Sequence, residues 1–170
     1  STPRNKGKGH AVRQGMLAAS GEYLFFTDAD LSTPIEEVER FLPLLEKDAD
    51  VVIGSRALPG SRIEIRQNPL REAMGKIFNR IARLTAFTTV RDSQCGFKGF
   101  RREAALNLFA AQKLDGFSFD AEIVYLAQKK GLRLRELPVI WRNSPQSRVH
   151  ILLDPIRMFL DILKIRRLHD

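Results

Sequence analysis

The chain has 170 residues, the size of one ordinary domain, and 44% of them are hydrophobic, which excludes a chain that is disordered throughout. Lys and Arg outnumber Asp and Glu by 28 to 20, so the net charge of +8 favours anionic partners: nucleic acid, phosphorylated substrates or anionic lipid headgroups. The single cysteine excludes an internal disulfide framework and a cysteine-based zinc site, and no apolar run is long enough to span a membrane.

The first ten residues are basic and contain two glycines ahead of an expected helix, which carries an apolar stripe from Val12 to Ala19. Backbone amides at a helix N-terminus, together with Lys6 and Lys8, can cradle a phosphate. Solvated lysines in a flexible terminus would explain the same residues, and the sequence of this segment alone leaves both interpretations open.

Two carboxylates follow the first predicted strand. Tyr23–Thr27 is short, aromatic and apolar, as is typical of a buried strand, and Asp28 and Asp30 come directly after it. Thr33, the proline after it and Glu36 predict a helix that begins with a capping box. Ligands of open α/β sheets bind at the carboxyl ends of the strands, so this placement favours a divalent cation that also holds a diphosphate.

The same Asp-Ala-Asp tripeptide occurs again at Asp48–Asp50. This second copy precedes the apolar run Val51–Ile53, so it lies at the entrance of a strand, the wrong end for a ligand site in a parallel sheet. Turn formation is the alternative role for either copy. Strand polarity therefore favours metal binding for the first copy only.

Two arginines are predicted near the same edge of the sheet. The helix between the first two strands implies a right-handed parallel crossover, which places Arg56, after the second strand, beside the two carboxylates. Residues 57–68 are rich in Pro, Gly, Ser and Arg and predict a loop near the site. Arg71 falls in the first turn of the next helix, an unfavourable place for a cation unless an anion lies nearby. A surface position is the alternative for Arg71.

The second half of the sequence predicts a short strand before residue 101, helices at 102–111 and from about 117 to 131, and a strand at 134–141. Pro138 indicates that this last strand lies at a sheet edge. Asp120 and Glu122 lie near a helix N-terminus, where helix capping is the structural alternative to a chemical role.

The last predicted helix is amphipathic, and it can pack on the body, dimerise or lie on a membrane. Its cations, concentrated toward the end, and a phenylalanine on the apolar side favour the membrane surface. The apolar side is Ile156, Phe159, Leu160, Leu163 and Ile165, opposite Arg157, Asp161, Lys164, Arg166 and Arg167.

Six blocks in order resemble the family 2 glycosyltransferases, in particular the polyprenyl-phosphate hexosyltransferases. They are Asn-Lys-Gly-Lys-Gly at 5–9, Asp-Ala-Asp at 28–30, Gly-Ser-Arg at 54–56, Asp-Ser-Gln-Cys-Gly-Phe-Lys at 92–98, Phe-Asp-Ala-Glu at 119–122 and Ser-Arg-Val-His at 147–150. Each block is weak alone, but together they span nearly the whole chain.

The resemblance implies an α/β fold of the Rossmann-like GT-A type, with a mixed, mostly parallel sheet. Residues 1–150 would form this domain and residues 151–170 an amphipathic, membrane-interfacial helix. Because the sequence starts about where the third strand of such a sheet ends, the domain is expected to lack its N-terminal strands. A fragment of this kind would be inactive alone.

The resemblance also assigns the donor site. Asp28 and Asp30 would hold Mg²⁺ or Mn²⁺ together with the diphosphate of a nucleotide-sugar donor. Lys8 and Gly9 would line the nucleotide pocket.

Further roles follow from the same resemblance. Gln94 and Asp120 would face the sugar, with Asp120 where many relatives have a catalytic carboxylate. The phosphates of acceptor or donor would be bound by Arg56, Arg71 and Arg148. Two of these arginines, Arg56 and Arg71, would also take part in catalysis.

The implied reaction is transfer of a hexose to a polyprenyl or dolichyl phosphate, with inversion, at the cytoplasmic face of a membrane. The acceptor oxygen is already anionic, so Asp120 is expected to anchor the sugar rather than act as an obligatory base. Ser32, where mannosyl-transferring relatives often have Gln, favours UDP-glucose over GDP-mannose. A GDP-mannose donor and a non-lipid acceptor remain alternatives. A nucleic-acid-binding module is disfavoured because the basic residues are spread along the chain.

Overall fold

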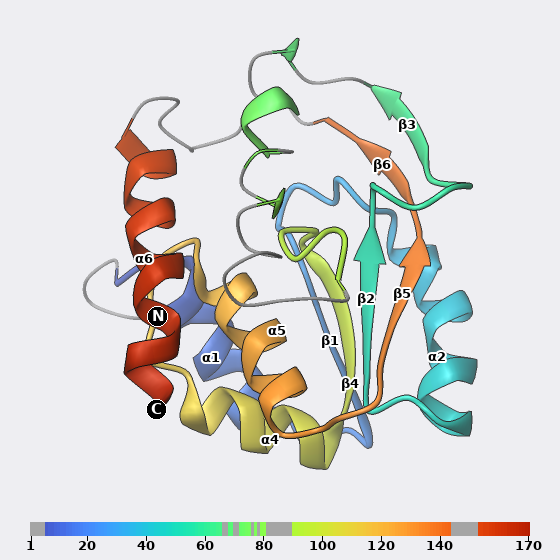
Figure 1. The fold of residues 1–170 in the computed structure, drawn as a ribbon. Coiled ribbons are helices and arrows are strands. Elements are labelled where there is room, and N and C mark those ends of the chain that lie inside the picture. The colour runs from blue at the N-terminus through green and yellow to red at the C-terminus, as the bar shows by residue number, and fades with distance from the viewer. Residues whose placement is uncertain are drawn as a thin grey trace.

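A computed structural model of the chain describes residues 6–65, 68–69, 72–75, 77, 79–80, 90–143 and 153–170, with side chains in the last range from residue 157 onward. It shows an α/β fold with a four-stranded sheet and a two-stranded sheet (Figure 1). The strands are β1 Tyr23–Thr27, β2 Val51–Ser55, β3 Arg62–Ile65, β4 Phe97–Arg101, β5 Leu134–Pro138 and β6 Ile140–Arg142. The helices are α1 Lys8–Ala18, the 3₁₀ turn η1 Ile35–Glu37, α2 Val38–Lys47, α4 Arg102–Ala111, α5 Phe119–Lys129 and α6 Leu153–His169.

The larger sheet is mixed, as predicted, in the order β1-β4-β2-β5. Strand β4 is antiparallel to both β1 and β2, whereas β5 is parallel to β2. Strands β1, β2 and β5 therefore point the same way, and their carboxyl ends share one edge of the sheet. The predicted crossover does connect two parallel strands, but β4 lies between them. Strand β5 is an edge strand, as Pro138 indicated.

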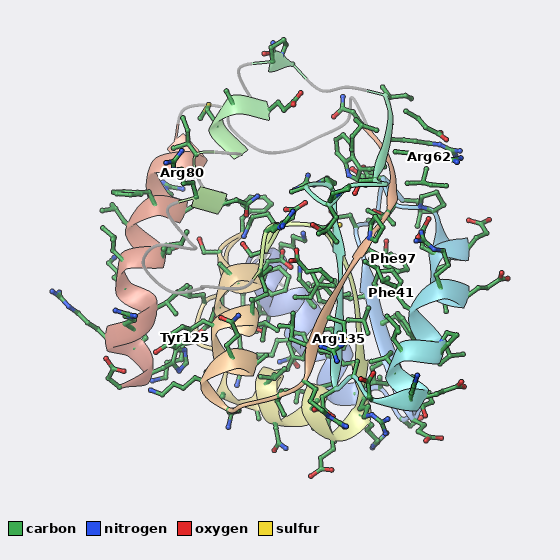
Figure 2. All side chains as sticks on the ribbon, turned by 45° about the vertical axis from the view of Figure 1, so that its right-hand side comes forward. Phe41, Arg62, Arg80, Phe97, Tyr125 and Arg135 are labelled. Atoms are coloured by element: carbon green, nitrogen blue, oxygen red, sulfur yellow. The ribbon has the colours of Figure 1, made fainter. Side chains whose placement is uncertain are left out.

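Successive side chains of a strand point to opposite faces of the sheet, and both faces are covered. Leu24 and Phe26 of β1 lie in the larger core, which α1, α4, α5 and α6 complete. Phe25 packs against the second core, under α2. There Phe41 of α2 and Phe97 of β4 meet edge to face, with ring centroids 5.0 Å apart (Figure 2). The apolar run of β1 is thus explained by burial on both sides.

The start of the helix after β1 differs from the prediction. The helical segment begins at Ile35 with a 3₁₀ turn, Pro34 occupies the N-cap position, and no side chain caps it. Thr33 is buried instead. The backbone N–H of Ser32 donates to the Asp30 carboxylate, 3.0 Å away, so the chain is still in a turn where the capping box would begin.

Two further predictions need correction. The strand predicted at 134–141 is interrupted at the buried residue Val139, so that β5 pairs with β2 and β6 pairs with β3 in the second sheet. The segment predicted as a loop contains β3, because the N–H of Arg62 donates to the carbonyl of Val139 at 3.0 Å. Most of the helix predicted after Asn68 lies outside the described residues.

Helix α6 packs on α5 (Figure 1). Ile162 and Ile165 are fully buried there and belong to the larger core. The side chains of Lys113 and Lys129 donate to the carbonyls of Leu168 and His169 at its C-terminal end. Within the described part of the chain, no helix has both the length and the apolar content needed to cross a membrane.

Candidate active site

Asp28, the first residue after β1, is held against the turn that precedes β4. Its N–H donates to the carbonyl of Gly96 at 2.9 Å. A Cβ on Gly96 would lie only 1.9 Å from Oδ2 of Asp28, so only glycine leaves room for the carboxylate. Lys8, at the start of α1, places its Nζ 2.6 Å from Oδ1 of Asp28. The carboxylate is therefore fixed from two sides.

We expect Gly96→Ala to displace this carboxylate, because the contact of 1.9 Å cannot be kept. Affinity for a Mn²⁺–UDP complex should fall by about tenfold or more, a loss of one charge-assisted contact, as measured by titration calorimetry. Gly15→Ala is the matched control: a Cβ there meets nothing within 4 Å. Because Gly15 lies in the interior of α1, Gly15→Ala should leave the affinity for Mn²⁺–UDP unchanged and stabilise the fold by about 0.5–1 kcal/mol. Equal affinity in both variants would contradict this account of Gly96.

Lys8 also reaches Asp120, the second residue of α5, at 3.5 Å from Oδ2. The other oxygen of Asp120 pairs with Lys98 of β4, and neither side chain of this pair is exposed by more than 2%. Asp28, Lys8, Asp120 and Lys98 thus alternate in charge, and we call them the charge chain. Burial by itself lowers the pKa of Lys8, but attraction by Asp120 and Asp28 outweighs it and raises the pKa. Lys8 is therefore a cation at neutral pH.

Lys98 is the charged residue of the candidate site that sequence reasoning missed. It is fully buried, donates to the carbonyl of Cys95 at 2.7 Å and lies 5.2 Å from the ring centroid of Phe26. The signal for it was present in the sequence: a lysine between Phe97 and Gly99 in a short apolar strand needs a buried carboxylate partner. Sequence spacing alone could not say that the partner is Asp120.

Asp30 lies on the exposed turn beyond Asp28. Leu31 has φ of 50°, in the left-handed region, and its N–H donates to the carbonyl of Asp28 at 3.0 Å. In the same turn, Oδ1 of Asp30 accepts a hydrogen bond from the N–H of Ser32 at 3.0 Å. Asp28 and Asp30 thus both lie at the carboxyl end of β1.

The residues at this position fit a hard divalent cation that is shared with a ligand. Asp28 and Asp30 supply carboxylate oxygens, the donors that Mg²⁺ and Mn²⁺ prefer, and two protein ligands leave coordination positions for diphosphate oxygens and water. Across the described residues, His, Cys, Asp and Glu side chains form no group of three that could hold a metal ion.

Arg56, directly after β2, is bound to Asp92. Its Nε and Nη2 donate to the two carboxylate oxygens at 2.7 and 2.9 Å, and its backbone N–H donates at 3.0 Å. Asn79 donates to the same carboxylate at 3.2 Å, and the guanidinium lies 5.4 Å from the ring of Trp141. Burial raises the pKa of Asp92, but the Arg56 charge and these hydrogen bonds outweigh it and lower the pKa to about 2.

This shift predicts how stability depends on pH. The folded pKa of Asp92 of about 2 lies below the value of about 3.9 in unfolded chains, so its contribution is complete above about pH 4 and is lost as the pH falls toward 2. Between pH 5 and 2 the free energy of unfolding should fall by about 2–3 kcal/mol more in the unaltered protein than in Asp92→Asn, measured by urea unfolding. Asp48→Asn, at an exposed carboxylate, should retain the full acid dependence. Parallel curves for the unaltered protein and Asp92→Asn would disprove the assignment.

The remaining predicted site residues differ in their placement. Gln94 has a buried Nε2 that lacks a hydrogen-bond partner within the described part of the chain. Gly9 is buried where a Cβ would lie 2.7 Å from both the carbonyl oxygen of Leu114 and the Cβ of Phe119, so it allows α1 to approach α5. Arg71 and Arg148 lie outside the described residues.

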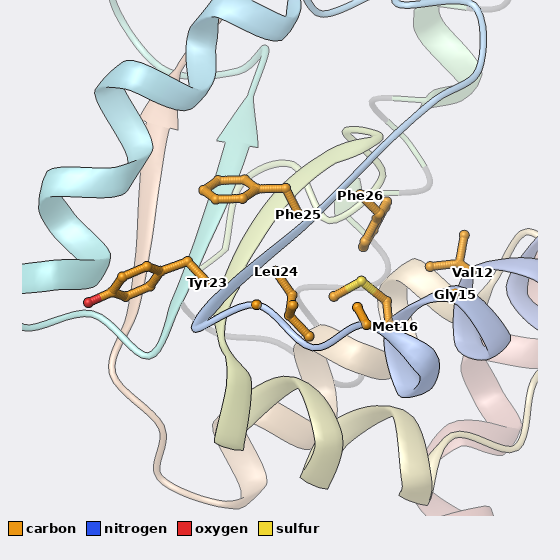
Figure 3. Close-up of a pocket in the computed structure, with 9 residues that line it drawn as sticks. Val12, Gly15, Met16, Tyr23, Leu24, Phe25 and Phe26 are labelled. Atoms are coloured by element: carbon orange, nitrogen blue, oxygen red, sulfur yellow. The ribbon is translucent and has the colours of Figure 1, made fainter.

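The structure also has an apolar pocket, which shares no residue with the charge chain. It opens between α1 and β1, and its lining residues are Val12, Gly15, Met16, Ala19, Gly21, Tyr23, Leu24, Phe25 and Phe26 (Figure 3). Strand β1 is at the edge of the described sheet, where a further strand could pair. The pocket is thus a feature of this sheet edge rather than of the carboxylate site.

Comparison with known proteins finds a matching family and several relatives. The family model "Glycosyl transferase family 2" matches residues 1–109. Dolichyl-phosphate beta-glucosyltransferase of Saccharomyces cerevisiae is 33% identical over 175 residues, covering 96% of this chain and 52% of that protein. A Trichomonas vaginalis protein of the same name is 36% identical over 169 residues, covering 96% of this chain and 50% of that protein. The chain thus spans about half the length of these relatives.

Solved structures show the same fold. Glucosyl-3-phosphoglycerate synthase from Mycobacterium tuberculosis with UDP superposes with a TM-score of 0.62 at 18% identity, covering 97% of this chain and 56% of that one. The same enzyme with Mn²⁺, UDP-glucose and glycerol 3-phosphate gives a TM-score of 0.58 at 18% identity, covering 97% and 55%. The predicted GT-A fold is confirmed by these neighbours and by the mixed sheet. The chain belongs to glycosyl transferase family 2.

Proposed function

We propose that the protein transfers a hexose from a nucleotide-sugar to a polyprenyl phosphate such as dolichyl phosphate, with inversion at the anomeric carbon, and that the donor is UDP-glucose. The observation that carries the proposal is the charge chain, which gathers Asp28, Lys8 and Asp120 at the carboxyl ends of the strands. The yeast and Trichomonas vaginalis relatives, named for glucosyl transfer to dolichyl phosphate, support the choice of sugar and acceptor.

The donor diphosphate would bind at the carboxyl end of β1. Asp28 and Asp30 would hold Mg²⁺ or Mn²⁺, which when bound neutralises charge on the departing diphosphate. The Mycobacterium tuberculosis synthase that shares the fold has been crystallised with Mn²⁺ and UDP-glucose, which supports this choice. Lys8 is placed to bind a diphosphate oxygen, because its Nζ already lies 2.6 Å from the Asp28 carboxylate. Gly9, at the same helix start, would contribute by letting α1 pack closely against Leu114 and Phe119.

Asp120 would position groups rather than remove a proton. Both of its oxygens contact lysines, Lys8 and Lys98, and a phosphate acceptor is already anionic at neutral pH. Its task would be to fix Lys8 and, with Gln94, to orient the sugar. The amide nitrogen of Gln94 has no partner among the described residues and could donate a hydrogen bond to a sugar hydroxyl.

The acceptor phosphate would be bound by Arg56, Arg71 and Arg148. For Arg56 this leaves Nη1, since its Nε and Nη2 are committed to Asp92. The acceptor lipid would place the enzyme at a membrane surface, on the cytoplasmic side, where nucleotide-sugars are present.

The test is transfer from a panel of radiolabelled UDP- and GDP-sugars to polyprenyl phosphate by the full-length protein. Labelled lipid from UDP-glucose alone is the expected result. Labelled lipid from GDP-mannose would correct the sugar, and transfer only to a water-soluble acceptor would correct the acceptor. Transfer from no donor to any acceptor would refute the proposal.

A further inference from the structure

Helix α6 has two apolar faces rather than one. Ile162 and Ile165 are exposed by 1% and 0% and face α5. Phe159, Leu160 and Leu163 are exposed by 39%, 47% and 47%. Residues three and four apart share a face of a helix, so these three form a second apolar surface, which we call the outer trio. The sequence pattern had grouped Ile165 with the outer trio, whereas the structure places it on the opposite side.

The surface around the outer trio is basic. Asp161, the acid of α6 whose side chain is described, accepts a hydrogen bond from the hydroxyl of Ser118 at 3.0 Å, and Asp170, directly after the helix, pairs with Lys129 at 3.3 Å. The four exposed cations of the helix are Arg157, Lys164, Arg166 and Arg167.

We propose that the outer face of α6 docks in the plane of a membrane that contains anionic lipids. The outer trio would enter the boundary between headgroups and acyl chains, and the four cations would lie among the headgroups, as in interfacial helices. A second copy of this chain is a poorer occupant, because it would bring the same four cations against these. The identity of the membrane rests on the proposed function, since it would be the one that holds the lipid acceptor, but docking itself does not require transfer.

Docking in this way would also orient the candidate site. Two polar contacts fix helix α6 to the rest of the domain. Asp161 accepts a hydrogen bond from Ser118, and Nε2 of His169 lies 2.6 Å from the buried Glu122. Ser118 is two residues from Asp120 in the charge chain. A membrane bound to the far side of α6 would therefore set the position of the site relative to the lipid surface.

The direct test places a fluorophore in the outer trio. Leu163→Cys can be labelled selectively with an environment-sensitive dye, because Cys95 is fully buried and burial raises the pKa of its thiol to about 11. Ile65→Cys on β3, exposed by 52%, is the matched control. With phosphatidylcholine vesicles that contain phosphatidylserine, we expect blue-shifted emission and quenching by acyl-chain spin labels at position 163 only. Unchanged emission at position 163 would overturn the proposal.

A second measurement separates this proposal from the proposed function. Leu160→Ser with Leu163→Ser should lower transfer to polyprenyl phosphate in vesicles by about tenfold or more, a loss of apolar burial, while transfer to a short, water-soluble isoprenyl phosphate stays unchanged. If the unaltered protein labels neither acceptor, the function proposal fails and the quenching result still decides docking. A dimer in analytical ultracentrifugation that this double variant abolishes, without quenching, would make the face a self-interface and overturn membrane docking.

Discussion

Asp30→Asn in the full-length protein is expected to lower hexose transfer by about 10²–10³-fold, the range for removal of one preorganised electrostatic contact at a developing charge. The carboxylate is exposed, and the only hydrogen bond it accepts within the described residues is from the backbone of Ser32. An amide oxygen can still accept that bond, so the fold should persist while the anionic metal ligand is lost. Initial rates at saturating donor measure the effect, and electron paramagnetic resonance of Mn²⁺ with UDP measures the binding of metal separately.

Asp48→Asn is the internal control for Asp30→Asn, since Asp48 begins the second Asp-Ala-Asp tripeptide. Asp48 pairs with Arg135 at 3.1 Å on the exposed surface at the opposite end of β2. Its replacement should leave transfer and Mn²⁺ binding unchanged. Equal losses in the two variants would show that strand polarity does not distinguish the two tripeptides, and unaltered transfer by Asp30→Asn would remove this residue from the metal site.

Lys98→Met is expected to destabilise the fold by about 3–5 kcal/mol, because it leaves the buried Asp120 carboxylate with Lys8 as its remaining ion-pair partner. For a chain of this size such a loss lowers the Tm by roughly 10 °C or more. Thermal unfolding followed by circular dichroism measures it. Asp120→Asn should also destabilise, since it leaves Lys98 buried without a countercharge.

The double variant Lys98→Met with Asp120→Asn tests whether the two residues act as a pair. It should be less destabilised than the sum of the single variants, with a coupling energy of about 2 kcal/mol or more. The exposed pair of Asp48 and Arg135 is the comparison and should show coupling below about 1 kcal/mol. Additive effects at Lys98 and Asp120 would exclude a paired role for them.

The sequence predicts those parts of the fold that depend on neighbouring residues. The strand at Tyr23–Thr27 and the helix at Arg102–Ala111 have the predicted bounds, because the hydrophobic pattern of each segment reports its own burial. The division of the predicted strand at Val139 was not foreseeable in the same way. It depends on Arg62, far away in sequence, donating to the Val139 carbonyl, and no pattern within residues 134–141 records that bond.

The same distinction applies to the candidate site: placement next to a strand could be predicted, whereas contacts between distant segments could not. Asp28 and Asp30 could be predicted because both follow one strand directly. Their relation to Lys8 and Asp120 comes from packing of α1 and α5 against the sheet, which residue types alone do not specify. For Arg56 the sequence predicts the correct edge of the sheet, but not that its Nε and Nη2 donate to Asp92.

The alternation of charges in the charge chain has a consequence for the order of ligand binding. Its two carboxylates and two ammonium groups sum to zero, so a free divalent cation must compete with Lys8 for Asp28 and approach two like charges. If the cation instead arrives bound to a diphosphate, Lys8 can leave the Asp28 carboxylate and pair with the anionic oxygens of the diphosphate. We therefore expect the metal to bind weakly by itself and to enter together with the nucleotide.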